Sequence, residues 1–271
     1  MPNQLLYYKE IWNLEYDGES FTTNSGLLQP ALFEGKECML KIGRREKDTR
    51  ANELMIWWQG DGAAKVLRHD QLALLMERAK EGQSLHEMAR NGHDTEASCI
   101  LCGVAARLHS HRPPYPDNLV PLTFWFEELP LASAKHGGIF TECSRIADSL
   151  LDSQQYVIAL HGDIHHGNVL DFGDRGWLAI DPKGLVGERG FDYANIFCNP
   201  DAATATQSGR LIEQAAIVAD AAGLDQIRLL RWIASWAGLS ASWCINDKED
   251  PQQAMSVAKL AIARLRALTV L

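Results

Sequence analysis

The chain has 271 residues, of which 46% are hydrophobic and 23% charged, the balance of an ordinary globular protein. Asp and Glu number 35 against 26 Lys and Arg, a formal net charge of −9. This acidic balance argues against a nucleic-acid binder held by phosphate contacts. No apolar run is long enough to predict a membrane span, and the first ten residues lack the basic and apolar regions of a secretory signal.

The six cysteines are scattered over the chain, which is typical of reduced thiols in a cytoplasmic protein. Cys99 and Cys102 form a C-x-x-C pair, a spacing that occurs in metal and redox sites. They lie within a segment of helical pattern, however, and no second cysteine or histidine pair stands at zinc-finger spacing. We therefore interpret both as core thiols.

The first part of the chain alternates short strand-like runs with turn residues. Residues 21–33 and 37–42 predict two strands joined by a tight turn at Glu34-Gly35-Lys36. A helix is expected over 44–59, because the segment is rich in helix formers and Gly60-Asp61-Gly62 follows it. The apolar run at 72–76 predicts a buried strand.

Beyond residue 80 the pattern becomes helical. Ser84 and Glu87 have the spacing of a capping box, and apolar residues repeat at helical spacing over 97–108. Three more helices are expected at 205–222, 225–246 and 252–269. The layout predicts a small strand-rich part, residues 1–80, and a larger helical part, residues 81–271, with a ligand cleft at their junction.

The most informative segment runs from Leu160 to Leu170 and reads LHGDIHHGNVL. It places Asp163 and Asn168 in a loop between apolar runs, and Asp181 follows the apolar strand at 177–180. One Asp that accepts a hydroxyl proton, with an Asn and a second Asp that hold Mg²⁺, is the constellation of phosphoryl transfer.

Two alternatives to phosphoryl transfer are a zinc site and a polar loop without chemistry. The zinc site would use the loop's histidines, at positions 161, 165 and 166. Their spacing lacks the glutamate of a metalloprotease helix, and Gly162 and Gly167 oppose a helix there.

This loop, with Ile180-Asp181-Pro182, resembles the catalytic and metal-binding segments of the aminoglycoside phosphotransferases. Residues 175–197 are similar to the streptomycin 6-kinase branch, also described as aminoglycoside/hydroxyurea antibiotic resistance kinases. The resemblance implies an α+β, bilobal protein-kinase-like fold. Its small N-lobe, an antiparallel sheet plus one helix, would bind ATP, and its larger C-lobe would be mainly helical.

The resemblance implies that Asp163 is the catalytic base and that Asn168 and Asp181 are the Mg²⁺ ligands. The triplet Asp171-Phe172-Gly173 comes too soon after Asn168 to be the metal segment, and we expect a turn between two short strands there. His-Gly-Asp in place of the His-Arg-Asp of protein kinases favours a small-molecule acceptor.

Lys41 emerges from the apolar run at 38–40, where a kinase places the lysine that holds the α- and β-phosphates. The partner of this lysine should be a glutamate on the following helix. Glu53 is the first candidate, because the neighbouring apolar residues suggest an inward helix face, and Glu46 is the alternative.

Residues 22–26, with Ser25 and Gly26, are expected to cover the phosphates, although they lack a G-x-G-x-x-G pattern. The adenine site is expected after the strand at 72–76. There the carbonyl of Glu77 and the N–H of Ala79 would bind the base, with Met76 lining the pocket.

The resemblance indicates an ATP-dependent transfer of the γ-phosphoryl group to a hydroxyl of an aminoglycoside, with streptomycin as the first candidate. A cationic acceptor of this kind needs carboxylates. Glu188, Asp192 and Asp247 are the candidates, although Asp192 is expected above all to brace the catalytic loop. The alternatives are a kinase of the same fold for an endogenous hydroxylated metabolite and a catalytically silent nucleotide-binding regulator.

Overall fold

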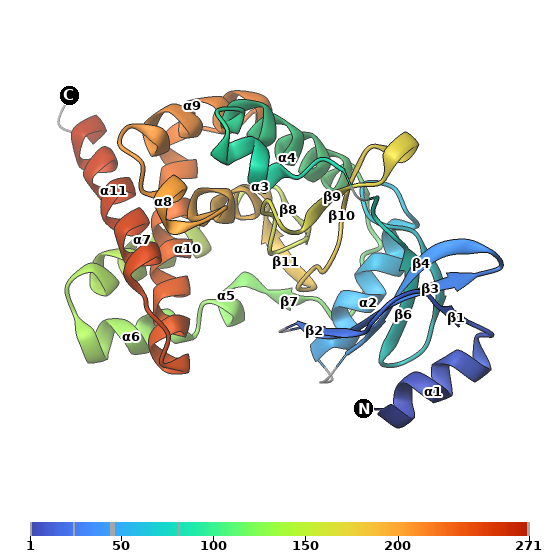
Figure 1. Ribbon diagram of the computed structural model, residues 1–271. Helices are drawn as coiled ribbons and strands as arrows, with labels where there is room; N and C mark the ends of the chain where they lie inside the picture. The colour runs from blue at the N-terminus through green and yellow to red at the C-terminus, as the bar shows by residue number, and fades with distance from the viewer. Residues whose placement is uncertain (1, 24, 44–46, 81, 270–271) are drawn as a thin grey trace.

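Six strands in the first part of the chain form one antiparallel sheet (Figure 1). The structure, a computed structural model, describes residues 2–23, 25–43, 47–80 and 82–269. The strand order is β1-β3-β4-β6-β5, with β2 paired to β3. The strands are β1 (Glu15–Tyr16), β2 (Phe21–Thr23), β3 (Gly26–Phe33), β4 (Lys36–Ile42), β5 (Val66–His69) and β6 (Ala73–Glu77).

The hairpin between β3 and β4 confirms the expected tight turn. Glu34 and Gly35 have φ values of 51° and 72°, the left-handed conformation that a two-residue hairpin turn requires. The expected strand at 21–33 is divided, however, because β2 ends at Thr23 and β3 begins at Gly26. The two pieces pair with each other as a second hairpin.

Successive side chains of β4 point to opposite faces of the large sheet, and the two faces have different surroundings. Cys38, Leu40 and Ile42 join a small core with Tyr8 of α1 (Pro2–Ile11). Lys41 stands between Leu40 and Ile42 and therefore points to the opposite face. That face carries residues of the main core and is covered by α2 (Lys47–Trp58). The sheet thus directs Lys41 towards the rest of the molecule.

The second part is mainly helical, which confirms the predicted α+β class. Its longest helix, α10, is buried over most of its length and packs on α7, α11 and the 3₁₀ helix η2. The helices are α3 (Leu85–Arg90), α4 (Asp94–His109), α5 (Leu122–Trp125), α6 (Glu128–His136), α7 (Ile139–Leu151), η1 (Gly173–Arg175), η2 (Arg189–Cys198), α8 (Ala202–Ala205), α9 (Arg210–Ala222), α10 (Gln226–Asp247) and α11 (Gln252–Thr269).

Two small sheets lie between the large sheet and the helices (Figure 1). One is the hairpin of β9 (Val169–Asp171) and β10 (Trp177–Ala179), with the turn at 171–173 that the sequence predicted. The other has the order β7-β11-β8, from β7 (Val120–Pro121), β8 (Val157–Leu160) and β11 (Leu185–Glu188). These strands hold the segments 161–168 and 180–184 that connect them.

Several element boundaries differ from the predictions. The side chain of Ser84 makes no capping hydrogen bond, although α3 does begin at the next residue. The helix expected at 205–222 is divided into α8 and α9, because Gly209 adopts φ 83° immediately before Arg210. The helices α1 and α5 to α7 were not predicted. The division into parts at residue 80 remains a prediction from the sequence.

None of the helices in the described residues combines the length and the apolar character that crossing a membrane requires.

The six cysteines are all free thiols, but they differ in burial. Cys102, Cys143 and Cys198 are buried, and burial raises the pKa of each thiol to about 12. Burial also raises the pKa of Cys38 to about 11. Cys99 is exposed, so the prediction of a core thiol is correct for Cys102 and wrong for Cys99.

We expect a thiol reagent at a pH near 8.5, the ordinary pKa of cysteine, to label Cys99 first in the native protein. The four buried thiols should react only after denaturation, because the thiolate is the nucleophile and burial disfavours it. Mass spectrometry of labelled peptides checks this. Cys99→Ser should remove the fast phase and Cys102→Ser should leave it unchanged; fast labelling of Cys102 would contradict the burial described here.

Candidate active site

Two separate segments, the loop 161–168 and the segment 180–183, are joined by hydrogen bonds into one unit. The backbone N–H of Lys183 donates to the carbonyl of His161 at 2.7 Å, and that of Ile180 donates to the carbonyl of Asn168 at 2.9 Å. The His161 ring adds a third link, because its Nε2–H donates to the Ile180 carbonyl at 2.9 Å. Its Nδ1 accepts the backbone N–H of Asp163 at 3.2 Å, which leaves no ring nitrogen free.

Gly162 is required where the two segments meet. Its φ of 84° lies in the left-handed region that favours glycine. A Cβ at this position would lie 2.7 Å from Leu185 Cδ1 and 3.1 Å from Lys183 Cβ. The close approach of the metal segment therefore excludes any side chain between the histidine and aspartate of the loop.

Asp192, in η2, holds the loop 161–168 in place through hydrogen bonds. Its carboxylate accepts the backbone N–H groups of His161 at 3.0 Å and of Gly162 at 2.6 Å. It also accepts a hydrogen bond from Nε2 of His109, in α4, at 2.8 Å. Only 1% of Asp192 is exposed, so it cannot contact an acceptor. Its assignment to substrate binding is wrong, and the bracing role is the one its contacts fit.

The carboxylate of Asp163 is held by three groups. Oδ1 accepts from Nδ2 of Asn195 at 2.7 Å, and Oδ2 accepts from Nδ2 of Asn168 at 3.1 Å and from Nζ of Lys183 at 2.8 Å. Asn195 lies in η2 and is itself oriented by Nε1 of Trp236, 2.8 Å from its Oδ1. The sequence analysis assigned no role to Asn195 or Lys183, although both lie within the family-like segment 175–197.

Asp181 meets Lys41 in an ion pair that connects the large sheet with the metal segment. Lys183 lies 3.7 Å from its other oxygen, and the Ser25 hydroxyl donates a hydrogen bond to it. Burial alone would raise the pKa of Asp181, but the charges of the two lysines and these hydrogen bonds outweigh burial and lower that pKa to about 2. The carboxylate is therefore ionised at neutral pH.

The structure does not bring Glu53 to Lys41. Glu53 is exposed on α2, whereas Lys41 is 6% exposed and pairs with Asp181. The prediction failed because the phase of the helix turns this side chain to solvent while Leu54 and Trp58 face the core. The alternative, Glu46, lies outside the described residues.

The residues predicted to bind nucleotide come from the large sheet and the segment that follows β6. Gly26 is needed for packing, since a Cβ there would lie 2.4 Å from the carbonyl oxygen of Ile42. Met76 is buried, and the Glu77 side chain accepts from Arg175 at 2.6 Å.

The N–H of Ala79 has no acceptor among the described residues, so it stays available to a ligand. Asn24, in the expected phosphate-covering segment, lies outside the described residues.

Asn168 and Asp181 are suited to a hard divalent cation. The Asn168 amide nitrogen donates to Asp163, which leaves its carbonyl oxygen free to bind a metal. Oxygen atoms of one amide and one ionised carboxylate are the donors that Mg²⁺ prefers, because this ion is bound by one or two carboxylates together with substrate phosphates. The donor set fits Mg²⁺.

The same geometry gives the zinc alternative no support. Within the described residues, no three His, Cys, Asp or Glu side chains are grouped as metal ligands. His165 Nδ1 accepts the N–H of Gly167 at 3.0 Å. His166 is 1% exposed, and burial together with nearby cations lowers its pKa to about 3.

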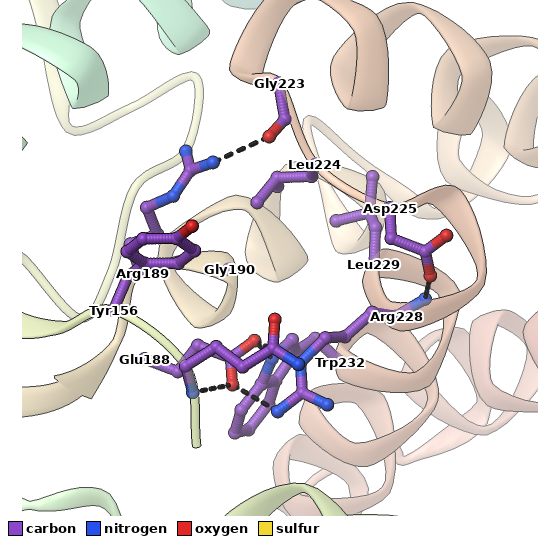
Figure 2. A pocket seen from close by; sticks show the side chains of 11 residues that line it. Tyr156, Glu188, Arg189, Gly190, Gly223, Leu224, Asp225, Arg228, Leu229 and Trp232 are labelled. Carbon is purple, nitrogen blue, oxygen red and sulfur yellow. Dashed lines mark hydrogen bonds and ion pairs between the residues drawn. The ribbon is translucent and has the colours of Figure 1, made fainter. Parts of the chain in front are cut away.

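Glu188 lies away from the site, and its assignment to substrate binding is wrong. On β11 it pairs with Val157, whereas Leu185 pairs with Leu160 beside the catalytic loop, so Glu188 stands at the opposite end of the strand. Its carboxylate accepts from Nε of Arg228 at 2.6 Å and from Nε1 of Trp232 at 2.8 Å. Figure 2 shows these side chains in the wall of a separate cavity of about 170 Å³. Asp247 is exposed at the end of α10, and its role stays a prediction.

We expect Asp192→Ala to lower the free energy of unfolding by about 3 to 5 kcal/mol, because it leaves two buried N–H groups and His109 without their acceptor. Asp192→Asn should cost less, since its carbonyl oxygen can still accept one of these bonds. Urea denaturation followed by tryptophan fluorescence measures both changes. The control Asp174→Ala, at an exposed position of η1, should change stability by less than about 0.5 kcal/mol. Equal losses in Asp192→Ala and the control would contradict the anchor.

Comparisons with known proteins agree with this geometry. The sequence model of the aminoglycoside/hydroxyurea antibiotic resistance kinases matches residues 11–248. A streptomycin 3''-kinase of Klebsiella pneumoniae is 47% identical over 88% of this chain and 91% of its own length. A streptomycin 6-kinase of Streptomyces griseus is 29% identical over 94% of this chain and 86% of its own length.

The solved structures extend the likeness to the fold. An aminoglycoside phosphotransferase of Streptomyces rimosus, in complex with ADP and streptomycin, aligns with a TM-score of 0.58 at 15% identity over 88% of this chain and 99% of its own. This likeness confirms the predicted bilobal kinase-like fold. The chain therefore belongs to the aminoglycoside/hydroxyurea antibiotic resistance kinase family and is a phosphotransferase with an alcohol group as acceptor.

Proposed function

We propose that this enzyme transfers the γ-phosphoryl group of ATP, with Mg²⁺, to the 3''-hydroxyl of streptomycin. The observation that carries the chemistry is the convergence of Asp163, Asn168 and Asp181 with Lys41 in one cleft. The substrate and position are favoured by the 47% identity to a streptomycin 3''-kinase, against 29% to a 6-kinase.

The chain's own residues account for the transfer step. Asp163, held by Asn195 and Asn168, orients the acceptor hydroxyl and takes its proton. The hydroxyl oxygen forms a bond to the γ-phosphorus, and the bond from that phosphorus to the β,γ-bridging oxygen breaks, with its electron pair remaining on ADP. Asn168 and Asp181 would hold Mg²⁺, which supplies neutralisation of the phosphate charge when bound.

Lys41 supplies a buried cation at the nucleotide side of the cleft. It is 6% exposed and fixed by β4 on the face of the sheet that looks towards the metal segment. Its ion pair with Asp181 connects β4 with the metal segment. In this position its ammonium would bind the α- and β-phosphates, so most of its contribution is to positioning the nucleotide.

Two tryptophans of α10 lie between the catalytic carboxylate and Asp247; Trp236 is buried and Trp243 is partly buried. Trp236 donates to Asn195, which contacts Asp163. The Trp243 ring, two helical turns along α10, lies 5.5 Å from the Trp236 ring. Asp247 follows one turn later on the same face of the helix. Guanidinium groups bind to carboxylates and to the faces of tryptophan rings, so the partly buried Trp243 and the exposed Asp247 suit a guanidinium-bearing acceptor.

The test incubates the full chain with ATP, Mg²⁺ and streptomycin and analyses the product by mass spectrometry and phosphorus–proton NMR. We expect one added phosphoryl group whose phosphorus couples to the proton at the 3'' position. Coupling at position 6 would overturn the position while retaining the substrate. ADP release with a hydroxylated metabolite but not with streptomycin would favour the metabolite kinase. Absence of any turnover would favour the silent regulator.

The control for chemistry in that test is Asp163→Asn, which keeps the size of the side chain and one acceptor oxygen but cannot take a proton. We expect kcat to fall by about 10²- to 10⁴-fold, the range for loss of a general base, with unchanged affinity for ADP. A variant with nearly normal kcat would overturn the role of Asp163.

For the acceptor surface, we expect Asp247→Asn to raise the KM for streptomycin about threefold to tenfold, the effect of about 1 kcal/mol from an exposed charge-assisted contact. The kcat should change little, because Asp247 is remote from Asp163. Steady-state kinetics measures both. Glu249→Gln, an equal change of charge in the adjoining loop, is the control and should leave KM unchanged. The same KM in Asp247→Asn and wild type would exclude the contact.

A further inference from the structure

Lys183 is the second cation of the active site, and the steps above give it no role. Its Nζ lies 2.8 Å from Oδ2 of Asp163 and 3.7 Å from Oδ2 of Asp181. The side chain is 32% exposed, so it is not enclosed in the core.

The backbone around Lys183 is fixed more firmly than its place in a connecting segment suggests. Its N–H donates to the carbonyl of His161 at 2.7 Å, and its Cβ is packed against Gly162. On its other side Gly184 has φ 67°, and a Cβ there would lie 2.8 Å from Cβ of Arg50. The catalytic loop therefore fixes the position of the Lys183 backbone, from which the side chain extends. A contact that stabilises developing charge has to be held in place before the reaction, and this backbone meets that condition.

A purely structural role explains the position of Lys183 poorly. A cation bound to Asp163 weakens that carboxylate as a base, which on its own would slow proton removal. Phosphoryl transfer proceeds through a loose transition state, in which charge is spread over the three equatorial oxygens and little base strength is required. A cation beside Asp163 therefore stabilises the transition state by attracting these oxygens, and this effect outweighs the lower basicity of Asp163.

We propose that Lys183 is a catalytic residue whose ammonium binds the phosphoryl group while it is being transferred. The inference rests on the proposed phosphotransfer and holds for any hydroxyl acceptor. Lys41 then holds the phosphates that stay with ADP. Lys183 binds the phosphoryl group that moves to the acceptor. Lys183 keeps its protons throughout, the acceptor proton passes to Asp163, and the electron pair of the broken bond stays on ADP.

The kinetic test compares Lys183→Met and Lys183→Arg with wild type. We expect Lys183→Met to lower kcat by about 10²- to 10³-fold, the cost of one transition-state donor, while the KM for ATP changes by less than about threefold. Lys183→Arg, which keeps the charge, should recover part of the loss. Lys259→Met removes a lysine from an exposed position on α11 and should leave kcat unchanged. A raised KM for ATP with unchanged kcat would overturn the proposal, because it would place Lys183 in ground-state binding.

A binding test separates this role from a structural one without any acceptor. Calorimetry measures the affinity for ADP with Mg²⁺, alone and with aluminium fluoride, a mimic of the transferring phosphoryl group. Wild type should bind ADP more tightly with the mimic, and Lys183→Met should lose that gain while binding ADP alone normally and keeping its melting temperature.

Two results would overturn the proposal. One is a wild-type protein that gains nothing from the mimic, and the other is a Lys183→Met protein that retains the gain. A Lys183→Met protein that loses ADP affinity and thermal stability together would show a structural lysine instead. Failure to phosphorylate streptomycin is a separate result, because this measurement contains no acceptor.

Discussion

The active site depends on one buried carboxylate that never meets the reactants. Asp192 accepts two successive backbone N–H groups, of His161 and Gly162, and a third hydrogen bond from His109. A buried charge with three donors is stable only while all of them stay in place, so it fixes the start of the catalytic loop to η2 and α4. The hydrogen bonds between the loop and the metal segment then transmit this position to Asp181.

A second constraint is the balance of charge in the cleft. Asp163 and Asp181 both approach Lys183, and two carboxylates so close would repel each other without cations between them. Lys183 comes from the metal segment, whereas Lys41 comes from the large sheet. Lys183 pairs with the carboxylates of both Asp163 and Asp181, and Lys41 links Asp181 to the sheet.

The spacing of Asp163, Asn168 and Asp181, in a short loop and after an adjoining strand, was enough to predict that they lie close together, and their roles stay predictions. The predictions that depended on which way a strand runs or a helix is rotated in the folded chain were wrong. Glu188 lies near the motif in sequence, but its strand runs away from the catalytic loop. The rotation of α2 turns Glu53 to solvent. Asn195 was missed because a 3₁₀ helix has no clear periodic pattern, and only the folded chain brings it to Asp163.

The tight packing at Gly162 has a further consequence for control of the enzyme. Protein kinases with His-Arg-Asp carry an arginine at the corresponding position, and arginines in such kinases pair with a phosphate on the activation loop, so that activity waits for a modification. Here Leu185 and Lys183 occupy the space that any such side chain would need. Switching by that route is closed to this protein.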